Sequence, residues 1–130
     1  MPFERNSQIL LVIQNVSWKH FYYGPRKLNI ILTQLRNSYS FLNYDISKVN
    51  IVNDASCSCG APLEDAYHYF FTCPNYAEIR LTMMNNLNWV QTIDLNLLIC
   101  GSDVLAYEEN INILKHIFNF IKSSERFLVV

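Results

Sequence analysis

Residues 57–76 read CSCGAPLEDAYHYFFTCPNY, and the spacing of cysteine and histidine in this stretch decides how the whole chain is interpreted. One residue separates Cys57 from Cys59, eight separate Cys59 from His68, and four separate His68 from Cys73. Three thiolates and one imidazole form a closed tetrahedral ligand set that is typical of structural zinc sites. The pattern therefore predicts a structural Zn²⁺ ion with no open position for a zinc-activated water.

The surrounding sequence favours metal ligation over the alternative, a set of reduced, buried cysteines beside a core histidine. Cys57 and Cys59 lie in the polar stretch 53–62, which is predicted to be a loop and has little apolar sequence to bury them. Gly60 follows directly, and glycine tolerates the positive φ that a tight turn between two ligands needs. Cys100 stands apart from this cluster, and we interpret it as a core residue.

The start of the chain shows no secretory signal. Its apolar run, residues 9–13, is too short for a signal peptide or a membrane span, and Glu4 interrupts a positive leader. Disulfides are therefore not expected, and clustered cysteines are interpreted as metal ligands. We expect an intracellular protein, in the nucleus or the cytoplasm, without a membrane partner.

The composition indicates a helical fold. Hydrophobic residues make up 51% of the 130 residues, and three glycines and four prolines are few for the many tight turns of a sandwich or barrel. We predict a mainly α fold, a small helical bundle with an inserted Cys₃His zinc-knuckle loop. A single domain is expected over residues 21–130, after a poorly determined leader at residues 1–20.

Helical periodicity places the main elements on either side of the ligand loop. Helices are predicted over residues 26–35, 77–87 and about 108–124. The first of these carries an apolar face formed by Leu28, Ile31, Leu32 and Leu35. The last is expected to be central to the core, because it has a broad apolar face formed by Ile113, Leu114, Ile117, Phe118 and Ile121.

Shorter stretches give less complete patterns. Ser40 is expected to cap a short helix whose apolar stripe is Leu42, Ile46 and Val49. Glu64 and Asp65 are interpreted as acids at a helix start. Residues 67–71 fit either a helix or a strand, and residues 94–99 form a short apolar piece ended by Gly101.

Charge is divided unevenly along the chain, although the formal net charge is only −1. Residues 1–50 carry six basic and two acidic side chains, whereas residues 51–130 carry four basic and nine acidic ones. A basic segment with interleaved aromatic rings can contact phosphates and stack on unpaired bases. The candidates for contacts with RNA or single-stranded DNA are Tyr22, Tyr23, Arg26, Lys27 and Arg36. The alternative is an ordinary solvated helix face whose aromatic rings are anchored in the core.

Several segments, taken in order, resemble the C-terminal cysteine-rich region of non-LTR retrotransposon polyproteins, downstream of their reverse transcriptase domain. FYYGPRKLN at 21–29 resembles the entry segment of animal members, and LTQLRNSYSFLN at 32–43 resembles their Leu-Arg…Ser-x-Leu-Asn signature. CSCG at 57–60, EDAYHYFFTCPNY at 64–76 and Arg80 resemble the Cys-x-Cys-Gly…Glu…His…Cys-Pro-x-Tyr…Arg pattern. LLICGS and IFNFIKSSERF resemble the ends of family members.

The resemblance implies that Cys57, Cys59, His68 and Cys73 occupy the four zinc-ligand positions of the family, the CCHC set. It also implies a module that helps a reverse transcriptase domain to hold template RNA or target DNA. The Tyr/Phe-x-Asp-Asp metal motif of reverse transcriptases does not occur in this chain, so we expect no enzymatic activity of its own. The spacing differs from that of the compact retroviral knuckle, whose base-gripping geometry is therefore not assumed.

Two other interpretations stay open beside a nucleic-acid module. The chain can be a zinc-stabilised scaffold that packs against another protein, for instance a reverse transcriptase domain, or a retroelement remnant without a function. The low net charge and the high apolar content favour the scaffold, whereas the basic first half favours nucleic acid.

Overall fold

Helix α2 (Arg26–Arg36) begins directly after Gly24 and Pro25 in the computed structural model, which describes residues 23–127. Gly24 has a φ of +73°, and a Cβ added there would lie 3.3 Å from Cδ2 of Phe118. Both the backbone angle and the limited space therefore favour glycine at this entry. The predicted apolar face of α2 is confirmed, because all four of its members are buried: Leu28, Ile31, Leu32 and Leu35.

Helix α3 (Asn43–Lys48) is short, and the prediction that Ser40 caps it is wrong. The Ser40 hydroxyl instead donates to Asp45 Oδ2 at 2.6 Å and accepts the Leu42 amide at 3.2 Å, so it organises the turn before the helix. Of the expected apolar stripe only Leu42 is buried, and Val49 is exposed. This helix therefore packs on the core mainly through the residue that precedes it.

The chain continues through the ligand loop into a series of helical elements. No strand occurs within residues 23–127, so the ambiguous stretch 67–71 is helical, and the prediction of a mainly helical fold is confirmed.

No helix in this part of the chain has both the length and the apolar character needed to cross a membrane. The elements after the loop are a π-helical turn η2 (His68–Thr72), a 3₁₀ turn η3 (Pro74–Tyr76), α4 (Ala77–Asn86), α5 (Leu95–Cys100) and α6 (Tyr107–Ser124).

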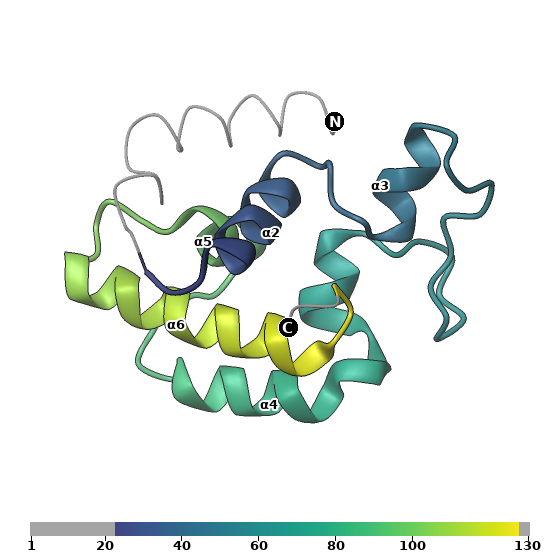
Figure 1. The fold of residues 1–130 in the computed structure, drawn as a ribbon. Helices are drawn as coiled ribbons and strands as arrows, with labels where there is room; N and C mark the ends of the chain where they lie inside the picture. The colour runs from purple at the N-terminus through teal and green to yellow at the C-terminus, as the bar shows by residue number, and fades with distance from the viewer. Residues whose placement is uncertain (1–22, 128–130) are drawn as a thin grey trace.

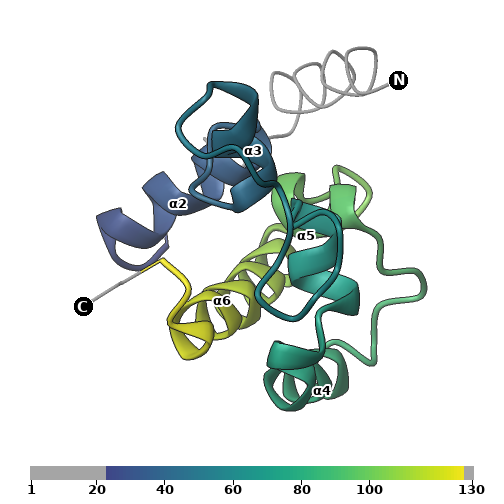
Figure 2. The ribbon, with the colours of Figure 1, turned by 90° about the vertical axis from the view of Figure 1, so that its right-hand side faces the viewer.

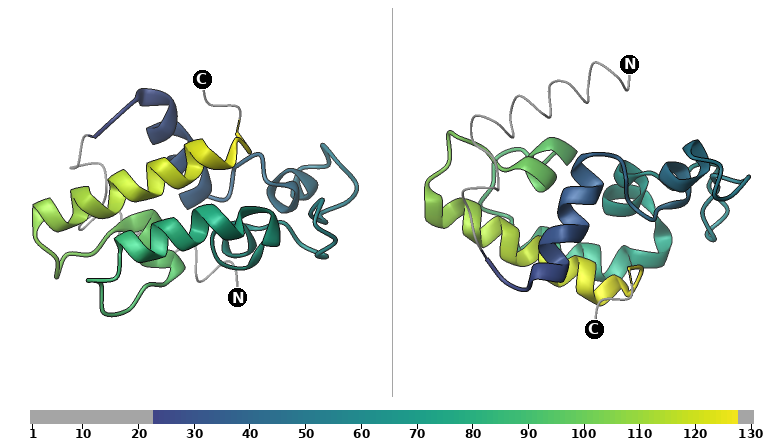
Figure 3. Two further views of the ribbon diagram at one scale, coloured as in Figure 1. Left: turned by 90° about the horizontal axis from the view of Figure 1, so that it is seen from below. Right: turned by 45° about the horizontal axis from the view of Figure 1, so that its top comes forward.

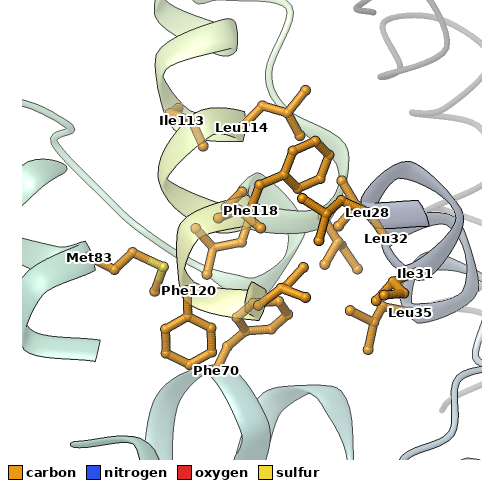
Figure 4. Packing of buried hydrophobic residues seen from close by; sticks show 14 of the residues in the cluster. Leu28, Ile31, Leu32, Leu35, Phe70, Met83, Ile113, Leu114, Phe118 and Phe120 are labelled. Carbon is orange, nitrogen blue, oxygen red and sulfur yellow. The ribbon is translucent and has the colours of Figure 1, made fainter. Parts of the chain in front are cut away.

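Helix α6 is the centre of the core, as its broad apolar face predicts. It lies between α2 and α4 (Figure 1) and contacts both helices. All five predicted face residues are buried. Figure 4 shows Phe118 directed toward Leu28 and Leu32 of α2, whereas Phe120 lies beside Phe70 on the other side. The ring centroids of Phe70 and Phe120 are 5.5 Å apart, which ties the η2 turn to the core.

Helix α3 and the loop that follows it stand apart from this core. They project at one end of the molecule, beyond the ends of α2, α4 and α6, in the views of Figures 1 and 3. Figure 2 looks onto this end and shows the loop passing between α3 and the helical turns before α4. Residues 49–63 contribute no side chain to the apolar core, so the conformation of this loop depends on local hydrogen bonds and on the cluster described next.

Candidate metal centre

The structure brings the four predicted ligands together. The ligand atoms of Cys57, Cys59, His68 and Cys73 all lie within 4.8 Å of one another, so this cluster could hold a metal ion. Cys57 Sγ lies 3.7 Å from Cys73 Sγ, and Cys59 Sγ lies 3.3 Å from His68 Nε2. All four cysteines of the chain are free thiols. No comparable group of three or more such ligands occurs elsewhere in residues 23–127.

The Cys57–Cys73 and Cys59–His68 separations are close to the edges of a tetrahedral zinc site. Zinc–sulfur bonds of about 2.3 Å and zinc–nitrogen bonds of about 2.0–2.1 Å place ligand sulfur atoms about 3.8 Å apart, and sulfur and nitrogen about 3.6 Å apart. The observed 3.7 Å between the Cys57 and Cys73 sulfur atoms agrees with the first value. The 3.3 Å between Cys59 Sγ and His68 Nε2 is slightly shorter than the second. Two of the six ligand–ligand separations are thus close to tetrahedral values, and all six lie within 4.8 Å, so the donor set could hold a metal ion.

A tight turn presents the first two sulfur atoms. The Gly60 amide donates to the Cys57 carbonyl at 2.9 Å, and the Cys57 amide donates to the Ala61 carbonyl at 2.9 Å. Gly60 has a φ of +103°, and a Cβ added there would meet no atom within 4 Å. Glycine is therefore required by the backbone angle and not by lack of space, which agrees with the expectation from sequence.

A π-helical turn presents the other two ligands. The Cys73 amide donates to the His68 carbonyl at 2.8 Å, an i→i+5 bond in place of the usual i→i+4 bond. In an α-helix, residues five apart would point about 140° away from each other around the axis. The wider turn lets His68 and Cys73 face the same cluster while Tyr69 and Phe70 between them are fully buried in the core.

Side chains from the neighbouring helices hold both turns in place through hydrogen bonds. Arg80 on α4 donates from Nε to the Phe70 carbonyl at 2.8 Å and from Nη2 to the Cys73 carbonyl at 2.6 Å. Asn43 on α3 donates from Nδ2 to the Ser56 carbonyl at 2.8 Å, directly before the first ligand. The cluster is thus held from α3 on one side and from α4 on the other.

Glu64 has a role that the sequence did not reveal. Asp65 is confirmed as a helix-start acid, because its Oδ1 accepts the His68 amide at 2.8 Å. Glu64 is not one: it is buried, accepts the Asn43 amide at 2.7 Å, and pairs with Arg126 through bonds of 2.8 and 2.7 Å. Burial alone would raise the pKa of Glu64, but hydrogen bonds from Arg126 and Asn43 hold it below its ordinary value. This carboxylate joins α3, the ligand loop and the end of α6.

The environment of the thiols differs between ligands. Burial, together with the neighbouring sulfur atoms and against the lowering effect of the Asn75 amide, raises the pKa of the Cys73 thiol to about 12. Hydrogen bonding by the Ala61 amide lowers the pKa of the half-buried Cys59 thiol. Cys73 therefore needs a nearby positive charge to ionise, which a divalent cation among the three sulfur atoms would supply.

Among the candidate nucleic-acid residues that the structure describes, Arg36 does not share a solvent-exposed face with the others. Arg26 and Lys27 are exposed at the start of α2, as expected. Arg36 is buried, and its Nε donates to the Ile99 carbonyl at 2.8 Å, so the expectation of a solvent-facing phosphate contact is wrong for this residue. Tyr23 stacks on Phe118 with ring centroids 6.2 Å apart, and Tyr22 lies outside the described residues.

Cys100 is confirmed as a core residue. It is fully buried at the end of α5, and burial raises the pKa of its thiol to about 11, although the neighbouring Arg36 guanidinium lowers it. It therefore belongs to the packing of α2 against α5 and not to the cluster.

Comparison of the chain with protein-family models, with curated proteins and with solved structures finds no match in any of the three.

Proposed function

We propose that Cys57, Cys59, His68 and Cys73 bind one structural zinc ion, and that the chain is a zinc-stabilised module without catalytic activity. The convergence of four ligand atoms within 4.8 Å, from two separately fastened turns, supports this proposal. Thiolate and imidazole ligands suit zinc, whereas magnesium and calcium prefer oxygen. Four protein ligands also leave no open coordination position for a substrate or a reactive water.

The purified chain is expected to bind one zinc ion per molecule. Three thiolates and Zn²⁺ together change the formal charge of the chain by −1 relative to the protonated thiols. Native mass spectrometry measures the stoichiometry, and cobalt substitution should give the intense visible bands of tetrahedral thiolate ligation. A chain that folds identically without metal, and takes up none, would contradict the proposal.

For the role of the module, the resemblance to the C-terminal region of non-LTR retrotransposon polyproteins leads us to propose assistance in binding RNA or single-stranded DNA, beside a reverse transcriptase domain. The exposed Arg26 and Lys27, with the half-buried Tyr23 just before them, support this role. The burial of Arg36 reduces the number of cations that can contribute. The candidate surface is thus confined to the start of α2.

Binding to single-stranded RNA is expected to weaken steeply with salt and to depend on Arg26 and Lys27. Each phosphate contact on a single strand contributes about 0.7 to the slope of log K against log salt, so the double alanine variant should lower the slope by about 1.4. Fluorescence anisotropy at several salt concentrations measures this slope. The matched control is Lys115→Ala with Lys122→Ala, which removes two exposed cations from α6.

A protein-binding scaffold is the second candidate. Large apolar side chains are exposed within and beside the ligand loop: Val49, Ile51, Leu63 and Tyr67. If the wild-type chain does not bind RNA or single-stranded DNA at low salt, or if the double variant binds equally well, the scaffold replaces the nucleic-acid role. A retroelement remnant without a function would bind neither nucleic acid nor protein.

A further inference from the structure

The imidazole of His68 is held from both of its nitrogen atoms. Nε2 faces the cluster and lies 3.3 Å from Cys59 Sγ, whereas Nδ1 lies 2.8 Å from the hydroxyl of Thr72. The same hydroxyl lies 3.4 Å from the His68 carbonyl oxygen. His68 itself is buried, so Thr72 is the partner that the protein provides for the nitrogen that does not face the sulfur atoms.

The chemistry of these groups defines one arrangement of protons in the metal-bound state. A neutral imidazole carries one N–H and one lone pair, and a metal at Nε2 requires that the proton lie on Nδ1. A carbonyl oxygen can only accept, so the hydroxyl proton of Thr72 can point toward the His68 carbonyl. The hydroxyl oxygen then accepts from Nδ1–H, and each of the three groups is satisfied.

We infer that Thr72 is a positioning residue of the metal centre: its hydroxyl fixes the tautomer and ring orientation in which His68 presents the Nε2 lone pair to the ion. This inference rests on the proposed zinc function. Metal-bound histidines usually donate their second N–H to an oxygen acceptor, and losing that acceptor costs about 10- to 100-fold in metal affinity. Thr72 is exposed, so water can replace its hydroxyl in part, and the lower end of that range applies.

Thr82 on α4 provides a matched control. It is also exposed, and its hydroxyl donates to the carbonyl four residues earlier, that of Glu78, at 3.3 Å. Thr72 makes the same kind of bond to His68 within η2, but it also contacts a candidate ligand. The variants Thr72→Val and Thr82→Val therefore remove equivalent backbone bonds, and only the first removes the contact with the imidazole.

The experiment compares zinc affinity in the full chain by competition with a chromophoric chelator at fixed pH. Thr72→Val should bind zinc about 10-fold more weakly than wild type, whereas Thr72→Ser and Thr82→Val should bind like wild type. Nitrogen-15 NMR of the zinc-loaded chains adds a second readout. The Nδ1–H signal of His68 should be visible in wild type and in Thr72→Ser, and lost to solvent exchange in Thr72→Val.

The outcomes separate this inference from the function on which it rests. If wild type binds zinc and Thr72→Val binds it equally well with its Nδ1–H signal retained, the positioning role is wrong and the zinc site stands. If Thr72→Ser fails to restore affinity, the methyl group and not the hydroxyl is what matters, and the inference is again wrong. If wild type binds no zinc, the proposed function fails first.

Discussion

Replacing Cys59 with serine, or His68 with alanine, is expected to weaken zinc binding by about 60- to 700-fold. Structural zinc contributes about 10–16 kcal/mol in small zinc-dependent folds, so an equal share for each of four ligands is about 2.5–4 kcal/mol. Each factor of ten in affinity corresponds to about 1.4 kcal/mol. Cys100→Ser changes a buried group outside the cluster and should cost about 1 kcal/mol in the free energy of unfolding, with zinc affinity unchanged.

Hydrogen exchange measures which amides lose protection when zinc binding is lost. Amides of the ligand loop, residues 53–63, should lose protection in Cys59→Ser and after chelation, because none of these residues belongs to the apolar core. Tyr69 and Phe70 should stay protected, since both are fully buried against α6. Equal losses of zinc affinity in Cys59→Ser, His68→Ala and Cys100→Ser would mean that the ligands are assigned wrongly.

Replacing Arg126 with methionine should destabilise the chain by about 3 kcal/mol, or lower the unfolding temperature by about 10 °C. Glu64 is buried, so removing its partner leaves a carboxylate without its counter-charge. The variant also removes the bond of 2.9 Å from Arg126 Nη2 to the Phe41 carbonyl. Thermal unfolding of the zinc-loaded chain measures the effect, with Lys122→Met, an exposed cation one turn earlier, as the control.

A double variant tests the cause of this loss. If the uncompensated charge of Glu64 is responsible, Arg126→Met combined with Glu64→Met should be more stable than Arg126→Met alone.

The pH dependence of stability follows in sign from the lowered pKa of Glu64. A carboxylate with a lowered folded-state pKa stabilises the fold above its ordinary pKa, and this is lost as the pH falls through the lowered value. The stability difference between wild type and Arg126→Met should therefore shrink below about pH 4. If Arg126→Met is as stable as Lys122→Met at pH 7, the Glu64–Arg126 ion pair contributes nothing to stability.

The helices could be predicted from the sequence where their apolar periodicity was complete. The burial of Arg36 could also have been predicted, from its position in the helical repeat and not from its charge. Leu28 and Leu32 are four residues apart, and Arg36 continues the same spacing, so it lies on the buried face of α2. A count of basic residues assigns this side chain to solvent, whereas its helical position assigns it to the interface with α5. Arg26 and Lys27 lie off this row of positions 28, 32 and 36, and both are exposed at the start of the helix.

The four candidate ligands could be predicted because their residue types and spacing alone define the chemistry. The Glu64–Arg126 pair could not, because its members are 62 positions apart in the sequence and neither lies in a periodic element that indicates the other. Arg80 and Thr72 act through hydrogen bonds to the carbonyl groups and the ring nitrogen of the turn that presents the ligands. Such contacts depend on the π-helical geometry of η2, which an i, i+3, i+4 pattern does not describe.

Because of the π-helical turn, insertions and deletions should be tolerated in some parts of the chain and not in others. Residues 68–73 serve two sides at once, since His68 and Cys73 face the cluster while Tyr69 and Phe70 fill the core. Deleting one residue there would restore an α-helical path and rotate every later side chain by about 100°, so that one side loses its residues. Residues 49–54 are mostly exposed and do not have to face both the cluster and the core. In homologues of this chain, insertions and deletions should therefore accumulate before Cys57 and be eliminated between His68 and Cys73.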